Sequence, residues 1–230
     1  MHPFWQSIFG SKLPSVYFCE EATSQFIARP GYFVSNIPYI LLGIYLLLIP
    51  KNQSAKLIGI SSILVGTFSS IYDASYTFYA NILDLMGMLI LLNVLFYISL
   101  KNIIKNHKLL IPILALNQIL YLALALVVQA RIGQIWFAVN ILFYIIIESI
   151  ILIKKRNNLN SKYFIIGLLT FVIGVAFWIP DGLHLYCFPS DWLQGRGIFH
   201  YITTIAIYLI YKYYISDKSY RNIKFPKKLE

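Results

Sequence analysis

Two pairs of polar residues with four-residue spacing are the first sign of chemistry in this sequence. Ser69 and Asp73 form one pair, Arg196 and His200 form the other, and both pairs lie in long apolar segments. Side chains four residues apart share one face of an α-helix, so each pair presents two polar groups on the same side. The opposite charges of Asp73 and Arg196 predict that the two helices converge in a shared buried cluster.

Three more ionisable residues fall near the ends of other apolar segments. Asp84 lies near the start of one segment, and Asp181 and His184 follow the end of another. Ionisable residues within a membrane span are costly and usually face a bundle interior or a watery cavity. We therefore predict one polar pocket built from four helix ends, with Tyr72 also lining it. The alternative for Asp84 and Asp181, taken singly, is that they cap helix ends and face interfacial water.

The composition indicates which elements position these residues. The chain has 230 residues, 59% apolar and 12% charged, whereas a soluble domain is about 45–50% apolar and about 25% charged. This excludes a soluble globule and a disordered chain, and two cysteines exclude a disulfide-rich scaffold. Seven apolar stretches without period-2 alternation predict an all-α fold, a single membrane domain built as a seven-transmembrane-helix bundle. The stretches are 33–49, 57–76, 80–100, 109–128, 133–153, 163–180 and 195–215.

The basic residues predict the orientation of this bundle. Most of the 19 Lys and Arg residues fall on one side, and the positive-inside rule makes that side cytoplasmic. The N-terminal segment, 1–32, is then extracytoplasmic, and the basic tail, 216–230, is cytoplasmic. The same asymmetry accounts for the net charge of +10 without a nucleic-acid partner. The cytoplasmic set is Lys51, Lys56, Lys101, Lys105, Lys108, Lys154, Lys155, Arg156, Lys162, Lys212, Lys218, Arg221, Lys224, Lys227 and Lys228; the outer side has Lys12, Arg29, Arg131 and Arg196, with the acids Glu20, Glu21, Asp73, Asp84, Asp181 and Asp191.

Several motifs around these residues resemble the alkaline ceramidases, which belong to a wider group of seven-helix membrane hydrolases that includes the adiponectin-receptor-like proteins. The resemblance covers about residues 17–212, and the predicted helix count and orientation agree with it. The motifs are Cys19-Glu20, Ser35-Asn36, Gly66–Ser75 (GTFSSIYDAS), Asn81–Asp84 (NILD), Phe177–Asp181 (FWIPD), Cys187–Ser190 (CFPS) and Leu193–His200 (LQGRGIFH).

The resemblance implies zinc-dependent hydrolysis of the amide bond of ceramide to sphingosine and a fatty acid. In the family, three histidines hold the zinc, one on the second helix and two on the seventh, with a Ser and an Asp nearby. Three histidines leave an open zinc position for a water, whose pKa falls to about 7. By position, Ser69 matches the family's serine, Asp84 its aspartate and His200 the second histidine of the seventh helix.

The other two metal positions depart from the family pattern. Asp73 stands at the histidine position of the second helix, and Arg196 stands at the first histidine position of the seventh. Arg has no available lone pair and stays cationic, so the three-histidine zinc site is not intact. We predict an Asp73–Arg196 ion pair where the metal would sit. The alternative is independent drift of the two residues in a site under no selection.

The N-terminal segment also departs from the family, which binds calcium beside the zinc. Glu20 matches an acidic element of that site, but Arg29–Tyr32 (RPGY) stands where an acid or amide and an Asn are expected. These residues offer too few hard oxygen ligands, so we predict no tight calcium binding. Cys19 and Cys187 both fall on the outer side, where an oxidising compartment favours a disulfide between them. Two buried free thiols are the alternative.

Three functional classes remain open from the sequence. The first is a ceramidase-like hydrolase, or a divergent amidase that uses Asp73, Asp84 and His200 with an altered metal or none. The second is a pseudoenzyme that binds ceramide, sphingosine or a fatty acid without cleaving it. The third is a transporter that uses Glu148, the only acid deep in a span, although Glu148 could instead pair with Lys154 or Lys155 near the cytoplasmic boundary.

Overall fold

The computed structural model describes residues 1–14, 16–50, 52–101, 104, 109–127, 130–154, 159–188 and 192–217, and the regular elements within these ranges are helices. The predicted all-α fold is confirmed for this part of the chain. In order, the helices are α1 (Pro3–Phe9), α2 (Pro30–Ser35), α3 (Ile37–Leu47), α4 (Gln53–Ser75), α5 (Phe78–Lys101), α6 (Leu110–Val127), α7 (Ala130–Lys154), α8 (Ser161–Gly182) and α9 (Gly195–Ser216). Parts of the predicted topology and motifs lie outside the described residues: Lys51, Lys105, Lys108, Lys155, Arg156, Pro189–Asp191 and the tail from 218 to 230.

Six segments among the described residues are long and apolar enough to cross a membrane, which makes the chain a multi-pass integral membrane protein. They are Pro30–Leu47, Gln53–Ser75, Phe78–Lys101, Leu110–Val127, Gly133–Lys154 and Ser161–Gly182. The seventh predicted helix, α9, has 22 residues and is about 33 Å long, enough for a bilayer core of about 30 Å. Arg196, His200 and Lys212 lower its hydropathy. A seventh crossing by α9 therefore stays a prediction.

The first span consists of two helices with a break at Asn36. Pro38 has no backbone N–H, so it cannot donate to the carbonyl of Val34, and this interrupts the hydrogen-bond ladder between α2 and α3. The Asn36 backbone N–H bonds instead to the Phe33 carbonyl at 3.3 Å. The break leaves the Asn36 side chain buried and turned toward α4, where it contacts the functional site.

The next helices pack closely on this first span. A Cβ atom on Gly43 of α3 would lie 2.6 Å from the carbonyl oxygen of Gly59 on α4, so this crossing requires glycine. Small residues that allow close backbone approach are typical of helix contacts in membranes. Tyr76, in a left-handed conformation with φ of 48°, and Thr77 connect α4 directly to α5. The two longest buried helices therefore form an antiparallel pair at the centre of the bundle.

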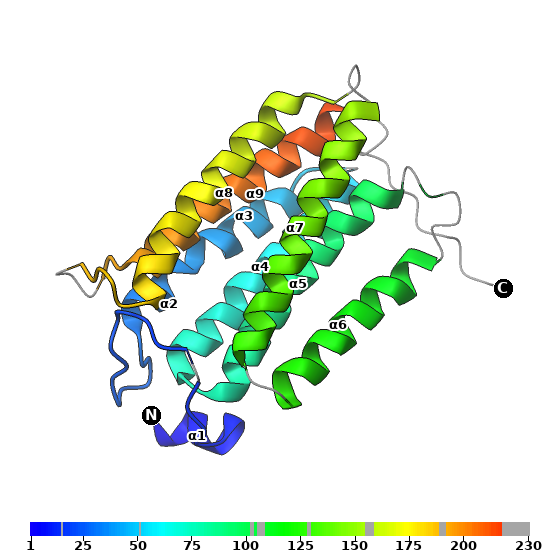
Figure 1. Cartoon of the computed structure of the whole chain (residues 1–230). Coiled ribbons are helices and arrows are strands. Elements are labelled where there is room, and N and C mark those ends of the chain that lie inside the picture. Colours follow the sequence, from blue (N-terminus) through cyan, green and yellow to red (C-terminus); the bar gives the residue numbers. More distant parts are fainter. Residues whose placement is uncertain are drawn as a thin grey trace.

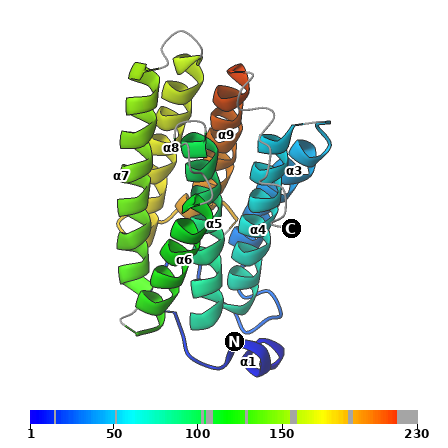
Figure 2. The ribbon, with the colours of Figure 1, turned by 90° about the vertical axis from the view of Figure 1, so that its right-hand side faces the viewer.

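The remaining helices surround this pair, as Figures 1 and 2 show. Helix α9 packs against α8 along its length and also contacts α2, α3 and α4, whereas α6 and α7 pack on α5. The end of α4, the start of α5, the end of α8 and the start of α9 lie at one end of the bundle, beside α1 (Figure 1). We call this the site end. The α4–α5 and α8–α9 connections therefore place residues that are distant in sequence at the same depth.

A network of amide side chains attaches α6 to the bundle. The side-chain amide of Asn117 on α6 donates to Asn93 on α5 and to Asn140 on α7, both at 2.9 Å. The indole of Trp136 donates to the Asn117 carbonyl oxygen at 3.0 Å. Such hydrogen bonds contribute to helix association in a membrane, because apolar contacts between helices are little more favourable there than contacts with lipid tails.

Candidate functional site

Five predicted residues from three helices gather at the site end. Ser69 and Asp73 lie in the last turns of α4, Asp84 lies in the second turn of α5, and Arg196 and His200 lie in the first two turns of α9. All five are buried. The four-residue spacing within α4 and within α9 places each pair on the inward face, as the sequence predicts.

Arg196 contacts two acids at the centre of this cluster. Its Nη1 lies 2.5 Å from Asp73 Oδ1, and its Nη2 lies 3.2 Å from Asp84 Oδ2. Nη2 also donates to Ser69 Oγ at 3.4 Å. The predicted ion pair between Asp73 and Arg196 is present, and Arg196 joins α9 to both α4 and α5.

Asp73 has a second cationic partner that the sequence analysis did not assign. Arg29 Nη2 donates to Asp73 Oδ1 at 2.7 Å, so one carboxylate oxygen accepts from both arginines. The other oxygen, Oδ2, accepts from Asn36 Nδ2 at 2.8 Å. The backbone N–H of Arg29 also donates to the Asp73 carbonyl at 3.0 Å. In the sequence, the one indication that Arg29 could reach the site was its position immediately before Pro30, where the chain enters the first span.

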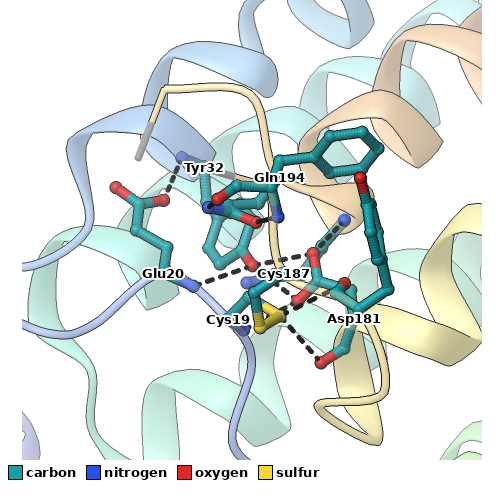
Figure 3. Close-up of a disulfide and its surroundings, with 9 residues drawn as sticks. Cys19, Glu20, Tyr32, Asp181, Cys187 and Gln194 are labelled. Carbon is teal, nitrogen blue, oxygen red and sulfur yellow. Dashed lines mark hydrogen bonds between the residues drawn. A yellow bond between two sulfur atoms is a disulfide. The ribbon is translucent and has the colours of Figure 1, made fainter. Parts of the chain in front are cut away.

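Asp181 binds the N-terminal segment to the start of α9 rather than joining the arginine cluster. Its Oδ1 accepts from the Cys19 backbone N–H at 2.8 Å and from the Tyr32 hydroxyl at 2.7 Å, and its Oδ2 accepts from the Arg196 backbone N–H at 2.5 Å (Figure 3). The carboxylate thus satisfies one of the free N–H groups at the N-terminus of α9. Tyr32 is a second site residue that the sequence analysis missed.

Glu20 performs a similar role at the start of α2. Its two carboxylate oxygens accept from the backbone N–H groups of Gly31 and Tyr32, each at 2.7 Å (Figure 3). Burial raises the pKa of the Glu20 carboxyl above its usual value, while the two backbone donors act in the opposite direction. Both oxygens therefore have a structural function in ordering the N-terminal segment.

A disulfide closes the N-terminal segment over the site end. Cys19 and Cys187 are bonded, with a Cα–Cα distance of 5.4 Å, so the pairing proposed from the sequence is present (Figure 3). The side chain of Gln194 braces the same loop through two hydrogen bonds to the Phe188 backbone, at 2.8 and 2.9 Å. His184 is exposed beside the disulfide and outside the buried cluster. Because the neighbouring sulfur atoms are bonded to each other, this group offers no thiolate to a metal.

The ring of His200 is oriented by a serine from the first span. Ser35 Oγ lies 2.8 Å from His200 Nδ1 and donates its own proton to the Tyr32 carbonyl at 2.7 Å. With that proton used, Ser35 accepts from Nδ1–H, which leaves the lone pair of the neutral ring on Nε2. His200 lines the cavity described below, so this side of the cluster presents a hydrogen-bond acceptor to a ligand.

These contacts allow a direct test of whether the site fits zinc and calcium. Zinc needs free lone pairs, but Asp73 Oδ1 accepts from two guanidinium groups and Oδ2 accepts from Asn36. Arg196 adds a cation and no donor atom. Calcium needs several free oxygen ligands, and both oxygens of Glu20 already accept backbone bonds. The described residues do not fit either ion.

Two adjoining cavities extend from the charged cluster into the bundle. The first has a volume of about 270 Å³ and is lined by Arg196, Asp84, His200 and apolar side chains. The second has a volume of about 130 Å³ and an almost entirely apolar lining. The two cavities adjoin, because Phe137 and Phe199 are among the residues that line both, and together we call them the slot. Its dimensions and lining are typical of a site for an apolar ligand with one polar end.

Two buried polar groups in the lining of the first cavity lack partners. The hydroxyl of Tyr72 and the side-chain N–H₂ of Asn81 have no hydrogen-bond partner among the described residues, although both side chains are more than nine-tenths buried. Leaving such groups unpaired costs about 1–3 kcal/mol each. Both residues line the cavity, but these two atoms are themselves covered by neighbouring groups, so a ligand reaches them only when a side chain shifts.

Glu148 lies in a separate polar cluster, toward the end of the bundle opposite the site end. Its carboxylate accepts from the hydroxyls of Tyr213 at 2.8 Å, Tyr214 at 2.7 Å and Ser99. The expectation that it pairs with Lys154 is corrected by these contacts, because the side chain points inward to α5 and α9; Lys155 lies outside the described residues. Three hydroxyl donors satisfy the buried carboxylate without a basic partner.

A comparison with models of protein families matches the model described as Ceramidase over residues 11–229. This match covers almost the whole chain and includes every segment that contributes to the charged cluster, from Glu20 to His200. A search of curated proteins finds no match.

Proposed function

Because the chain belongs to the ceramidase family, we propose that it binds a ceramide-type lipid between its helices and does not cleave it by zinc chemistry. The observation that carries this proposal is a ligand-sized slot that opens onto a cluster in which Asp73 and Arg196 bond to each other. The slot is large and apolar enough to bind a lipid, whereas an ion pair occupies the two positions, 73 and 196, at which the family has zinc-binding histidines. Transport through Glu148 is less well supported, since three hydroxyls enclose that carboxylate.

The length of the slot supports an acyl chain as its occupant. Its lining on α9 runs from Arg196 to Ile210, which corresponds to about 21 Å along the helix. The hydrocarbon core of a bilayer is about 30 Å thick and holds two acyl layers, so one chain spans about 15 Å. The slot is therefore long enough for one lipid chain, with its polar end at Arg196.

The polar end of the slot favours an intact amide headgroup. Tyr72 and Asn81 offer unpaired donors, and His200 Nε2 offers an acceptor. A secondary amide with nearby hydroxyls both accepts and donates hydrogen bonds, so ceramide fits this set. A fatty-acid carboxylate fits less well, because Asp84 lines the same cavity and Arg196 is already bonded to two carboxylates.

We also propose that α9 is a seventh crossing and that the site end is extracytoplasmic. The charge asymmetry of the sequence supports this orientation through the positive-inside rule. The Cys19–Cys187 disulfide supports it independently, because disulfides persist in oxidising compartments. Labelling of a single cysteine introduced at Glu21 in intact cells tests the orientation; protection from an impermeant reagent would contradict it.

The proposed function is tested by lipid binding to the purified protein. We expect ceramide to co-purify in mild detergent, as measured by extraction and mass spectrometry, and no ceramide hydrolysis after zinc is added. Ile141→Trp, which fills the shared part of the slot, should reduce bound ceramide at least about tenfold, the equivalent of about 1.4 kcal/mol. Leu142→Trp is the matched control, because that neighbouring side chain is exposed on the outside of α7.

Three results would overturn the proposal or part of it. Ceramide turnover that requires one zinc per chain would show that the site is an active hydrolase despite its ion pair. Equal ceramide content in the Ile141→Trp and Leu142→Trp variants would show that the lipid binds elsewhere. Sphingosine or fatty acid in place of ceramide, lost in Ile141→Trp, would overturn the assignment of the intact amide.

A further inference from the structure

Arg29 is a fully buried cation with a single strong ionic partner. Its side chain is 0% exposed, and Nη2 bonds to Asp73 Oδ1 at 2.7 Å. Its Nε and Nη1 have no hydrogen-bond partner among the described residues. A buried guanidinium is costly unless it is paired, so its retention at this position calls for a specific role.

The charge balance of the site end suggests this role. Among the described residues, four buried carboxylates lie here: Glu20, Asp73, Asp84 and Asp181. Arg29 and Arg196 are the buried cations beside them. Glu20 and Asp181 are stabilised by backbone N–H donors, whereas Asp73 receives both guanidinium groups on one oxygen. Asp73 Oδ1 thus bridges two positive groups, as a carboxylate oxygen can bridge two bound metal ions.

Aromatic rings hold both guanidinium groups in place. The rings of Phe18, Tyr32 and Tyr72 each lie within about 6 Å of both arginines, the range of cation–π attraction. Tyr76 adds a contact to Arg29 at 4.5 Å. These rings come from the N-terminal segment, α2 and α4, so the two arginines and their rings join the segments that close over the cavity.

We propose that Arg29 and Arg196 are built-in cations that replace bound metal ions at the site end and make its closure independent of divalent ions. Arg29 holds the N-terminal segment on α4 through Asp73, and Arg196 holds α9 on α4 and α5. Phe18 lines the cavity and lies within about 6 Å of both guanidinium groups, so its contacts with them fix this part of the cavity lining. This role of Arg29 does not depend on which lipid occupies the slot.

Removal of one built-in cation should create a need for an external one. We expect Arg29→Gln to lower the unfolding temperature of the purified protein by about 3–12 °C, because Asp73 loses one charged hydrogen-bond donor, of about 1.5–3 kcal/mol, and keeps Arg196. Arg29→Gln frees Asp73 Oδ1 from one of its two guanidinium donors, so this oxygen becomes open to a cation that the wild type excludes. Calcium chloride should then raise the unfolding temperature of Arg29→Gln by several degrees, since an ion that binds only the folded state stabilises it. The wild type should respond neither to calcium chloride nor to a chelator. Arg29→Lys, which keeps the charge, should remain insensitive to calcium.

Lys12→Gln is the matched control. It removes the same charge from the same N-terminal segment, but Lys12 is exposed and is not part of the Asp73 cluster. Lys12 makes one exposed cation–π contact, 3.7 Å from the centre of the Phe78 ring, so Lys12→Gln should unfold within about 2–4 °C of the wild type and should not respond to calcium.

Three outcomes with folded protein would overturn the proposal. They are a wild type destabilised by chelation, an Arg29→Gln variant as stable as Lys12→Gln, and a loss of stability in Arg29→Gln that calcium does not reduce. If Arg29→Gln yields folded protein only when calcium chloride is present during purification, that result supports the proposal. Failure to fold under both conditions, with Arg29→Lys also unfolded, would contradict it.

Discussion

Replacement of Asp73 by Asn tests the central contact of the site with almost no change of shape. The substitution removes one negative charge between Arg29 and Arg196, each of which is nearly or fully buried. Arg196 keeps Asp84 as an ionic partner at 3.2 Å, but Arg29 loses its only ionic contact among the described residues. At least one buried guanidinium is therefore left without a counter-ion.

The magnitude follows from the cost of an unpaired buried charge. Removing one partner of a buried pair costs about 3–5 kcal/mol. For a chain of this size, 1 kcal/mol corresponds to about 2–4 °C, so Asp73→Asn should unfold about 6–20 °C below the wild type. Thermal unfolding in detergent, followed by intrinsic fluorescence and by loss of the monodisperse peak in size exclusion, measures this difference.

Two companion variants separate the ionic effect from others. Glu21→Gln removes an exposed carboxylate from the same end of the molecule and should change the free energy of unfolding by no more than about 0.5 kcal/mol. The double variant Arg29→Gln/Asp73→Asn removes both charges, so its loss should be smaller than the sum of the single losses. An Asp73→Asn variant as stable as Glu21→Gln, or strictly additive losses in the double variant, would refute the reasoning.

Three other contacts give further predictions. Cys19→Ser opens a disulfide between residues 168 positions apart and should cost about 2–5 kcal/mol, measured by thermal unfolding; free-thiol labelling of denatured, non-reduced wild type that detects both cysteines would contradict it. Gly195→Ala places a Cβ 2.3 Å from a backbone carbonyl of α8 and should displace α9, whereas the Gly197→Ala control meets its nearest atom at 3.6 Å. The Gly195→Ala variant should bind less ceramide and unfold earlier, and equal behaviour of the two variants would argue against it. Glu148→Leu removes the acceptor shared by three buried hydroxyls, of which Ser99 and Tyr214 keep other partners, and should lower stability by about 1–3 kcal/mol, with a smaller loss for Glu148→Gln; equal losses would show that packing alone decides.

The sequence was sufficient for the features that depend on local order along the chain. The apolar stretches predicted the long helices α4 to α9 to within about four residues, since a membrane-spanning helix must be apolar over about 20 consecutive residues. Helix α1 and the break of the first span at Asn36 were not predicted. The four-residue spacing of Ser69 and Asp73 predicted their common face for an equally local reason. The family motifs around them were recognisable because they are short and contiguous.

Partners contributed by segments without periodic structure were not predictable in this way. Arg29 and Tyr32 lie where the chain enters the first span, and no spacing rule places them against α4 or α8. Their contacts with Asp73 and Asp181 depend on the path of residues 17–29 over the site end. The hydroxyls around Glu148 were missed for a similar reason, because two of them come from α9, more than 60 residues away.

By itself, the sequence determined the helices, the family and the opposite charges at positions 73 and 196, because hydrophobic length and helical spacing are properties of the chain alone. Only the tertiary structure decided that a second guanidinium, from Arg29, donates to the same oxygen of Asp73, and that the other oxygen accepts a hydrogen bond from Asn36. The pairing of a buried charge depends on every segment packed around it. For that reason, the three side-chain partners of Asp73 could be derived only from the assembled bundle.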